Sequence, residues 1–367
     1  MTLHTRKSVA LAAALTGATA LTALPGAAQE SGPSLEGETV EFVIPFSEAG
    51  GTAAWSNFYA PYLSDALPGE PTVVVRYRPG AGSTSGANWF QEQDTADGTL
   101  IFGSSGSTQF PYLLGDPRVR YDYADWQVTL ASGVGGVVYM RPDLAEQVDG
   151  DVDALQDNAY IFGAQGATTL DLVPLLAFKM LGLQTTPVFG IESRGNGRLM
   201  FERGEANIDY QTTPAYLTNV QPMVEEGIAQ PIFTWGSLDD EANIIRDPTF
   251  PDMPTFKEVC EATEDCQTSG PAWDAWKAFF IAGFPAQKMV FLPSEAPQEV
   301  VDVHTQAFSD VIADEDFQEA KQSTLGDYPQ LTGDAARNAK ELATTVSDEA
   351  RQWVIDWLQE DYDVKVE

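Results

Sequence analysis

The sequence predicts an α/β protein with two domains, and three observations support this. Short apolar runs rich in β-branched residues alternate with stretches of helical periodicity along most of the 367 residues. Repeated strand–loop–helix units are typical of a mostly parallel sheet with helices on its faces. The chain is also longer than one hydrophobic core usually holds.

Residues 1–28 are expected to be a signal peptide that is cleaved near Ala28. Arg6 and Lys7 precede an apolar run over 9–24, and small residues lead up to Gln29. A membrane anchor is the alternative, but the run is shorter than the ~20 residues that a spanning helix needs. The mature chain is therefore expected to be exported and soluble.

The composition excludes several classes of partner. The net charge of −34 becomes −36 once Arg6 and Lys7 leave with the signal peptide. Such a surface repels nucleic acid and anionic lipid, so neither is an expected partner. The chain is 43% hydrophobic and 11% aromatic, which favours a packed protein over a disordered one.

The first expected unit is a strand at 40–44, which is apolar and β-branched and ends at Pro45. A glycine turn follows, then a helix over 52–67 with its aromatic side chains on one face and a kink at Pro61. The pattern repeats: we expect strands at 72–77 and 99–103 and, after a Gly/Ser-rich turn, a helix at 84–93.

Residues 126–140 are expected to be extended and to cross into the second domain, because glycines at 133, 135 and 136 permit unusual backbone angles. There the alternating pattern predicts strands at 159–163, 187–191 and 229–235 and helices at 170–181, 196–203 and 214–226.

The chain is then expected to return to the first domain. Residues 236–272 are rich in proline and are expected to be an ordered but irregular connection. Apolar runs predict extended segments at 276–285 and 289–293, and helical periodicity predicts helices at 297–322 and 334–358, the last packing on the first domain. Domain 1 is thus expected to comprise 29–130 plus 250–367, and domain 2 to comprise 131–249.

The two cysteines, Cys260 and Cys266, are close in sequence in a chain that is expected to be exported. A structural disulfide that closes a short loop is therefore expected. A metal pair is the alternative, but no histidine is near.

Catalytic equipment is sparse. After cleavage the one histidine is His304, on the apolar seam of a late helix, where a packing role is expected. A two-histidine metal site is excluded, and a Ser–His–Asp triad would need this residue. The nucleophile-elbow and phosphate-loop motifs do not occur. With 54 acidic residues, a glycosidase-like carboxylate pair cannot be singled out. We expect no catalytic residue, no metal and no cofactor.

Turns of Gly, Ser, Thr and Ala follow several of the strands, and the turn at 46–52 opens a helix. Such turns present backbone N–H groups, and a helix N-terminus favours negative charge. Ordinary strand-to-helix turns are the alternative. Their recurrence in both domains favours an anion-binding cleft between the domains.

Three segments resemble a known family: IPFSEAGGTAAWSNFYAPYLSDALPG, VVVRYRPGAGSTSGANW and FGAQGATTLDLVPLLAFKMLG. They are similar in order and spacing to the substrate-binding receptors of tripartite tricarboxylate transporters (the Bug/TctC family). The resemblance implies a two-domain, type II periplasmic-binding fold with a ligand cleft between the domains. It also implies a periplasmic monomer that passes a di- or tricarboxylate or an aromatic acid to membrane components of the transporter. A secreted hydrolase or lyase working with carboxylates alone, or a ligand-binding sensor component, remains the alternative.

The resemblance also implies the ligand-binding residues. The first loop supplies Phe46, Ser47, Ala49, Gly50, Gly51 and Thr52, and the opposing loop supplies Gln165, Gly166, Ala167, Thr168 and Thr169. Ser105 and Thr108 line the floor, and Tyr210 and Gln211 face the far end of the ligand.

The chain departs from the family at three points. Ser47 and Glu48 stand where a proline pair is usual, and Glu48 is expected to point outward, since it would repel a carboxylate. Ala53 replaces an aspartate that serves amino-acid ligands, which argues against such a ligand. Either Arg194 or Arg198 pairs with a distal carboxylate of the ligand, or both form surface ion pairs.

Overall fold

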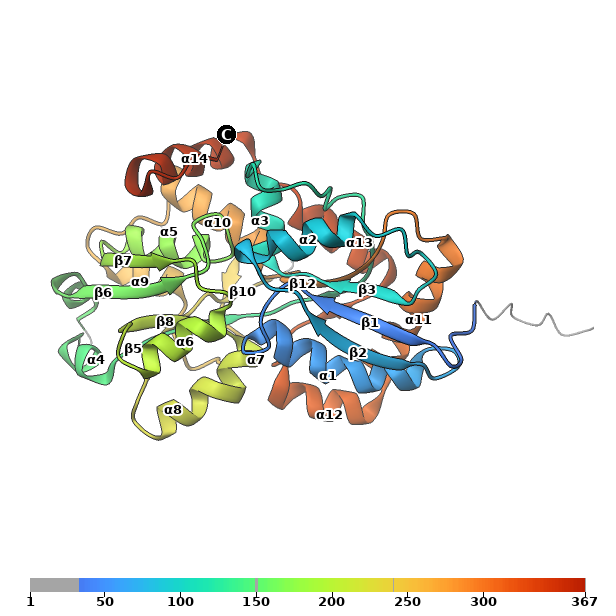
Figure 1. The fold of residues 1–367 in the computed structure, drawn as a ribbon. Coiled ribbons are helices and arrows are strands. Elements are labelled where there is room, and N and C mark those ends of the chain that lie inside the picture. The colour runs from blue at the N-terminus through green and yellow to red at the C-terminus, as the bar shows by residue number, and fades with distance from the viewer. Residues whose placement is uncertain (1–32, 149–150, 240, 367) are drawn as a thin grey trace, which may run out of the picture. The chain divides into compact units, whose positions relative to one another are not determined.

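The computed structural model describes residues 33–148, 151–239 and 241–366, so the predicted signal peptide lies outside the described residues. The largest sheet has six strands in the order β13-β4-β12-β3-β1-β2 (Figure 1). Their bounds are Thr39–Ile44 (β1), Thr72–Tyr77 (β2), Leu100–Gly103 (β3), Gln127–Ser132 (β4), Lys288–Leu292 (β12) and Gln330–Leu331 (β13). β1 is parallel to β2 and β3, whereas β12 is antiparallel to β3 and β4. The predicted mostly parallel sheet is therefore mixed, because β12 joins it from a distant part of the chain.

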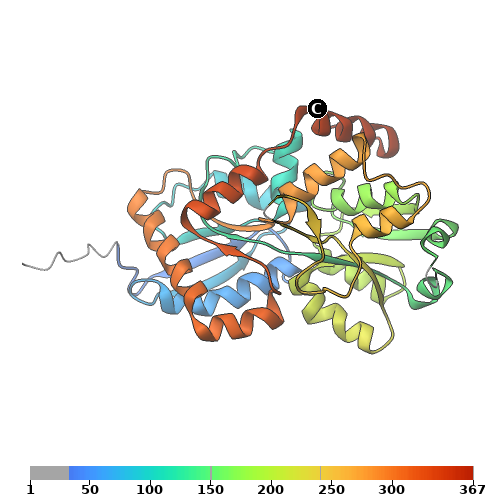
Figure 2. The ribbon, with the colours of Figure 1, turned by 180° about the vertical axis from the view of Figure 1, so that it is seen from behind.

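Helices cover both faces of this sheet (Figures 1 and 2). On one face, Tyr59 of α1 packs against Phe308 of α11 and Phe317 of α12, in a cluster that also contains Trp55. On the other, Phe90 of α2 and residues of α13 join a cluster with Phe102, Trp126 and Phe291. The helices are α1 (Gly51–Ala66), α2 (Thr84–Gln91, after a 3₁₀ turn at Ala81–Ser83), α3 (Gly106–Leu114), α11 (Gln298–Ala313), α12 (Glu315–Thr324) and α13 (Gly333–Ala343).

The strands between residues 136 and 245 pair with one another in smaller sheets. β5 (Gly136–Met140) lies antiparallel between β8 (Ile208–Thr212) and β9 (Gln230–Thr234), and β6 (Ala159–Ala164) is parallel to β7 (Gln184–Phe189). The helices here are α4 (Pro142–Val148), the 3₁₀ turn Val152–Asp157, α5 (Leu172–Met180), α6 (Arg194–Glu202), α7 (Thr213–Ala215), the π-turn Tyr216–Val220 and α8 (Gln221–Glu225). The predicted helix 214–226 is interrupted at the π-turn, beside Pro222, which lacks an N–H group.

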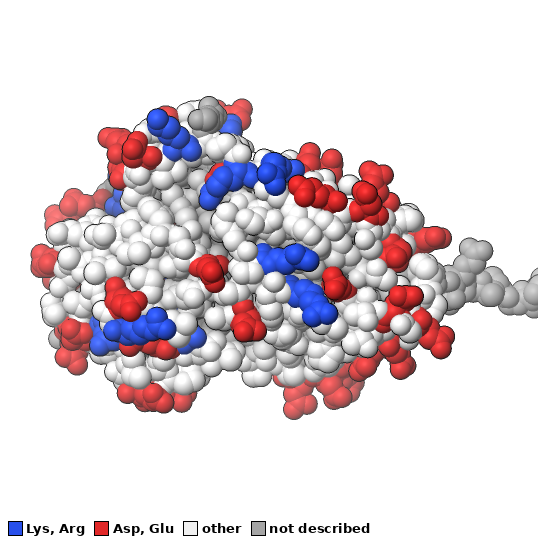
Figure 3. Space-filling model, viewed as in Figure 1, with Lys and Arg blue, Asp and Glu red and all other residues white. Residues whose placement is uncertain are grey.

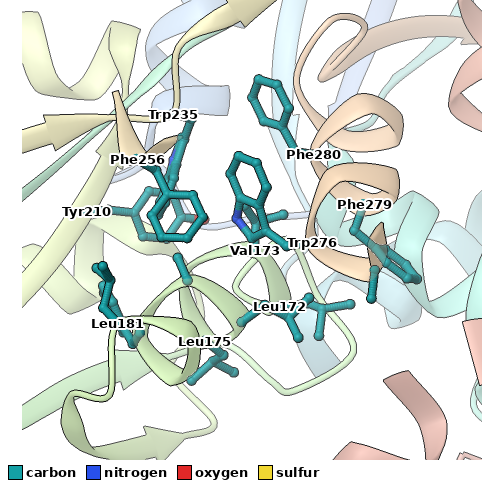
Figure 4. Packing of buried hydrophobic residues seen from close by; sticks show 14 of the residues in the cluster. Leu172, Val173, Leu175, Leu181, Tyr210, Trp235, Phe256, Trp276, Phe279 and Phe280 are labelled. Atoms are coloured by element: carbon teal, nitrogen blue, oxygen red, sulfur yellow. The ribbon is translucent and has the colours of Figure 1, made fainter. Parts of the chain in front are cut away.

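The extended segment predicted at 276–285 is wrong: residues 276–283 belong to helix α10 (Pro271–Gly283). Its buried aromatic side chains recur at helical spacing, and Pro271 suits the first helical turn. Trp276 packs on Phe256 at 4.5 Å between ring centroids and stacks on Phe280 at 5.2 Å (Figure 4). A short apolar run fits a buried strand and a buried helix equally well, and tertiary packing decides.

The connection 236–272 is less irregular than predicted. It contains the two-stranded pair β10 (Ser237–Leu238) and β11 (Ile244–Ile245) and helix α9 (Phe256–Ala262). α9 begins with a capping box of Thr255 and Glu258. The predicted disulfide between Cys260 and Cys266 is confirmed.

Both predicted C-terminal helices are divided. Asp314 caps α12 by accepting a hydrogen bond from the N–H of Phe317 at 2.8 Å, which ends α11. Ser347 caps α14 (Asp348–Tyr362) in the same way, separating it from α13. α13 packs on β4 of the large sheet, but α14 packs on α10, and Lys179 of α5 pairs with Asp361 at 2.7 Å. The single helix predicted at 334–358 is therefore wrong, whereas its packing on the predicted first domain is not contradicted, since α10 lies in 250–367; the domain boundaries stay a prediction.

Acidic side chains dominate the face shown in Figure 3, where Lys and Arg form small separate groups. This distribution agrees with the net charge of −34. In the part of the chain that the structure describes, no helix is long and apolar enough to cross a membrane.

Asp247 anchors the 236–272 connection. Its buried carboxylate accepts a hydrogen bond from the hydroxyl of Tyr328, with both oxygens at 2.7 Å, and another from the N–H of Thr249 at 2.9 Å. Burial raises the pKa of this carboxyl from 3.8 to about 6. The folded protein therefore binds this proton more tightly than the unfolded chain does. Protonation of Asp247 makes its full contribution to the unfolding free energy below the pKa of the unfolded chain, and this contribution is lost as the pH rises through about 6.

We therefore expect the unfolding free energy of the wild type to rise by about 1 kcal/mol relative to that of Asp247→Asn between pH 7 and pH 5. Urea denaturation of both proteins at the two pH values measures this, and the comparison cancels titrations that they share. Parallel pH profiles would contradict the prediction.

Candidate functional site

A narrow cavity lies where the first loop meets residues that follow β6 and β7. It is lined by Phe46, Gly50, Gly51, Thr52, Ser105, Ser107, Gln165, Leu170, Ser193, Arg194, Thr212, Gln287 and Lys288. Its volume is about 20 Å³, which suffices for one water molecule.

Three helices begin at this cavity. Gly51 opens α1 after an N-cap glycine without a capping side chain, Gly106 opens α3 behind the cap Ser105, and Arg194 opens α6 after Ser193. A helix N-terminus carries partial positive charge and N–H groups without partners in the helix. Three such ends around one cavity form an environment that favours an anion.

The two sides of the cavity are in close contact. The hydroxyl of Ser47 donates to Ser193 at 2.7 Å, and that of Ser107 donates to the side-chain oxygen of Gln165 at 3.3 Å. A Cβ atom on Gly195 would overlap the carbonyl oxygen of Ala49. A dicarboxylate can therefore enter only if these segments move apart.

The structure brings some of the predicted ligand-binding residues together. Six of them line the cavity: Phe46, Gly50, Gly51, Thr52, Ser105 and Gln165. Ser47 and Ala49 lie beside it in the contact between the two sides. Glu48 is exposed, as expected.

The other predicted residues do not line the cavity, and several have structural partners. Thr108 completes the α3 capping box, and Thr168 donates to Asp116 at 2.7 Å. Thr169 donates to the carbonyl of Gly166, which precedes Ala167 in the chain. Tyr210 donates to Asp171 at 3.0 Å, and Gln211 donates to Asp209 at 3.0 Å. Their role as ligand contacts stays a prediction.

Several lining residues were not among those predicted: Ser107, Leu170, Ser193, Thr212, Gln287 and Lys288. Ser107 lies in a Gly/Ser turn that had been noted after a strand. Lys288 stands directly before the apolar residues of β12, and a charge next to a buried strand is a signal for this residue in the sequence. Gln287 had no signal in the sequence, because its place in the cavity lining depends on the tertiary fold.

Arg194 is neither a surface residue nor an unpaired cation. Its guanidinium bonds to Asp209, lies 3.4 Å from Asp171 and donates to the carbonyls of Gly163 and Tyr210. It also lies 4.6 Å from the centroid of the Tyr210 ring. Asp171 and Asp209 are completely buried. Arg194 therefore holds α6, β6 and β8 together below the cavity, whereas Arg198 pairs with Glu202 within α6.

No Asp, Glu, His or Cys is among the lining residues, and the one titratable group there besides Arg194 is Lys288. His304 lies in the core, where its Nε2 is 3.0 Å from the carbonyl oxygen of Gly98. Burial lowers the pKa of His304 to about 4 and keeps it neutral. Within residues 33–148, 151–239 and 241–366, no cluster of three or more His, Cys, Asp or Glu residues could hold a metal.

A larger concavity of about 500 Å³ lies elsewhere, between α11 and α13. Its cations already have partners: Arg337 pairs with Asp334, and Lys340 donates to the carbonyl of Trp126 at 2.7 Å. Size alone therefore does not identify the site, and the narrow cavity remains the better candidate.

Neither a protein-family model nor a curated protein matches the sequence. Solved structures do match: the periplasmic binding protein BugD shares 19% identity, with a TM-score of 0.63 over 88% of this chain and 97% of its own. Rpa4515 of Rhodopseudomonas palustris, solved with adipate, shares 17% identity, with a TM-score of 0.64 over 88% of this chain and 96% of its own. MatC of the same organism, solved with bound malate, shares 17% identity, with a TM-score of 0.58 over 88% of this chain and 98% of its own. The chain therefore has the fold of these periplasmic binding proteins.

Proposed function

We propose that this protein is a periplasmic solute-binding receptor of the Bug/TctC type. It captures a small organic carboxylate between two domains, at 29–130 plus 250–367 and at 131–249, and passes it to the membrane components of a tripartite tricarboxylate transporter. Residues 1–28 direct its export. The mature receptor acts as a monomer and needs no cofactor.

The observation that carries this proposal is the meeting of three helix N-termini at one cavity whose lining contains no acidic residue. Partial positive charge from several helix ends, in a space that excludes most water, favours an anion far more than surface charge disfavours it. The acidic surface acts over longer distances, and salt screens it beyond ~8 Å. The similar structures with malate and adipate support a carboxylate as this anion.

The rival function, a hydrolase or lyase that uses carboxylates alone, is not favoured by this cavity, because no Asp or Glu lines it. Binding with hinge closure needs no such group. A sensor component would use the same cavity and would differ only in its protein partner.

We expect malate, adipate, citrate or benzoate to raise the melting temperature of the mature protein. A ligand at a hundred times its Kd adds about 2.7 kcal/mol to the unfolding free energy, which corresponds to a shift of several degrees. Adipamide, which has the length of adipate but no charge, is the control. If no acid in the panel shifts the melting temperature more than adipamide does, carboxylate capture is the wrong function.

A further inference from the structure

Lys288 is a buried cation without an anionic partner. Lys288 is the first residue of β12, is completely buried and is one of the residues that line the cavity. Its ammonium donates to the neighbouring Gln287 side chain, and no Asp or Glu of the described residues forms an ion pair with it. Burial lowers the pKa of Lys288 to about 7.

A lysine with a structural role in this protein has more acceptors, even though it is only partly buried. Lys340 has two backbone carbonyls as acceptors, from Ala124 and Trp126. Removing an ammonium from water is costly unless an opposite charge compensates it. The position of Lys288 thus destabilises the closed arrangement when no ligand is present, and calls for an anion from outside the chain.

A second unsatisfied donor lines the same cavity. The side-chain nitrogen of Gln165 is buried and has no hydrogen-bond partner. Its side-chain oxygen already accepts from Ser107, which fixes the orientation of the amide. Buried donors in native proteins are rarely left without acceptors, so an unpaired one in a cavity indicates a ligand atom that accepts.

We propose that Lys288 determines specificity in this cavity by pairing with one carboxylate of the bound solute, to which Gln165 also donates. The inference rests on the proposed function and deepens it, since it gives the solute a charged end that is buried against β12. An opposite charge within hydrogen-bonding distance keeps the lysine protonated. The helix N-termini supply the remaining donors.

The test is the affinity of the mature protein for malate and adipate, measured by calorimetry slightly below neutral pH. Lys288→Met keeps the length of the side chain and removes the charge, and we expect it to weaken binding of these acids about 10- to 100-fold. Adipamide is expected to bind both proteins weakly and equally. The control is Lys277→Met, on a half-exposed lysine of α10, which should leave the affinity unchanged.

The outcomes separate the two proposals. If the unsubstituted protein binds none of malate, adipate, citrate and benzoate, both the proposed function and the role of Lys288 are overturned. If it binds them and Lys288→Met binds them equally well, only the role of Lys288 is overturned. Thermal unfolding without ligand excludes misfolding, because the loss of an uncompensated buried charge should keep or raise the melting temperature of Lys288→Met.

Discussion

Replacing Arg194 by methionine is expected to lower the unfolding free energy by about 3–5 kcal/mol, because it leaves uncompensated buried charge. Asp171 and Asp209 are completely buried, and both pair with this guanidinium. Methionine fills much of the space but neutralises neither carboxylate. The carbonyls of Gly163 and Tyr210 would also lose their donors. Urea denaturation measures the change.

Arg198→Met is the matched control on the same helix. Arg198 pairs with Glu202 one turn away, and such pairs contribute about 0.3–0.5 kcal/mol. Adding Asp209→Asn to Arg194→Met should restore part of the loss, since it removes one of the unpaired charges. A similar cost for both single arginine variants, or no rescue in the double variant, would mean that the network does not stabilise the fold in this way.

Local patterns in the sequence were sufficient for the first unit. The β-branched run of β1, the glycines after it and the periodic aromatic residues of α1 all lie within 28 consecutive residues (39–66), and the helix begins one residue before the predicted start. The glycine turn that opens α1 was therefore predictable, while the binding of an anion there stays a prediction. Helical propensity and capping act over a few residues, which is why such features can be read locally.

Features that depend on distant segments were not predictable. The aromatic run of α10 fits either kind of element until Phe256, which itself packs on Trp235, is known to pack on Trp276. The burial of Arg194 depends on β6 and β8, and the approach of Lys288 to the first loop depends on an antiparallel strand inserted far along the chain. An isolated Arg or Lys in a sequence is usually solvated, so its burial can be recognised only from the fold.

Gly195→Ala is expected to weaken binding of malate and adipate about 10- to 100-fold while leaving the unliganded protein as stable as before, or slightly more so. A Cβ atom at this position would overlap the backbone carbonyl of Ala49, which no change of rotamer can relieve. Overpacking of this kind costs about 1–3 kcal/mol. Gly195 lies within α6, where alanine is the better helix former by about 0.5–1 kcal/mol.

Gly195→Ala should weaken ligand binding without lowering the stability of the unliganded protein, so the experiment separates a loss of closure from a general loss of stability. Because a dicarboxylate can enter only when α6 and the first loop are apart, we expect the unliganded protein to populate an open form in which the methyl group only strengthens the helix. On closure over the ligand, the methyl group would meet the carbonyl of Ala49. Glu202→Ala, an exposed substitution at the far end of α6, is the control and should not change the affinity. Calorimetry gives the affinity, and thermal unfolding gives the stability of the unliganded variants. If Gly195→Ala binds both acids as tightly as the unsubstituted protein does, the contact between α6 and the first loop is not part of the ligand-bound state, and closure must bring other surfaces together.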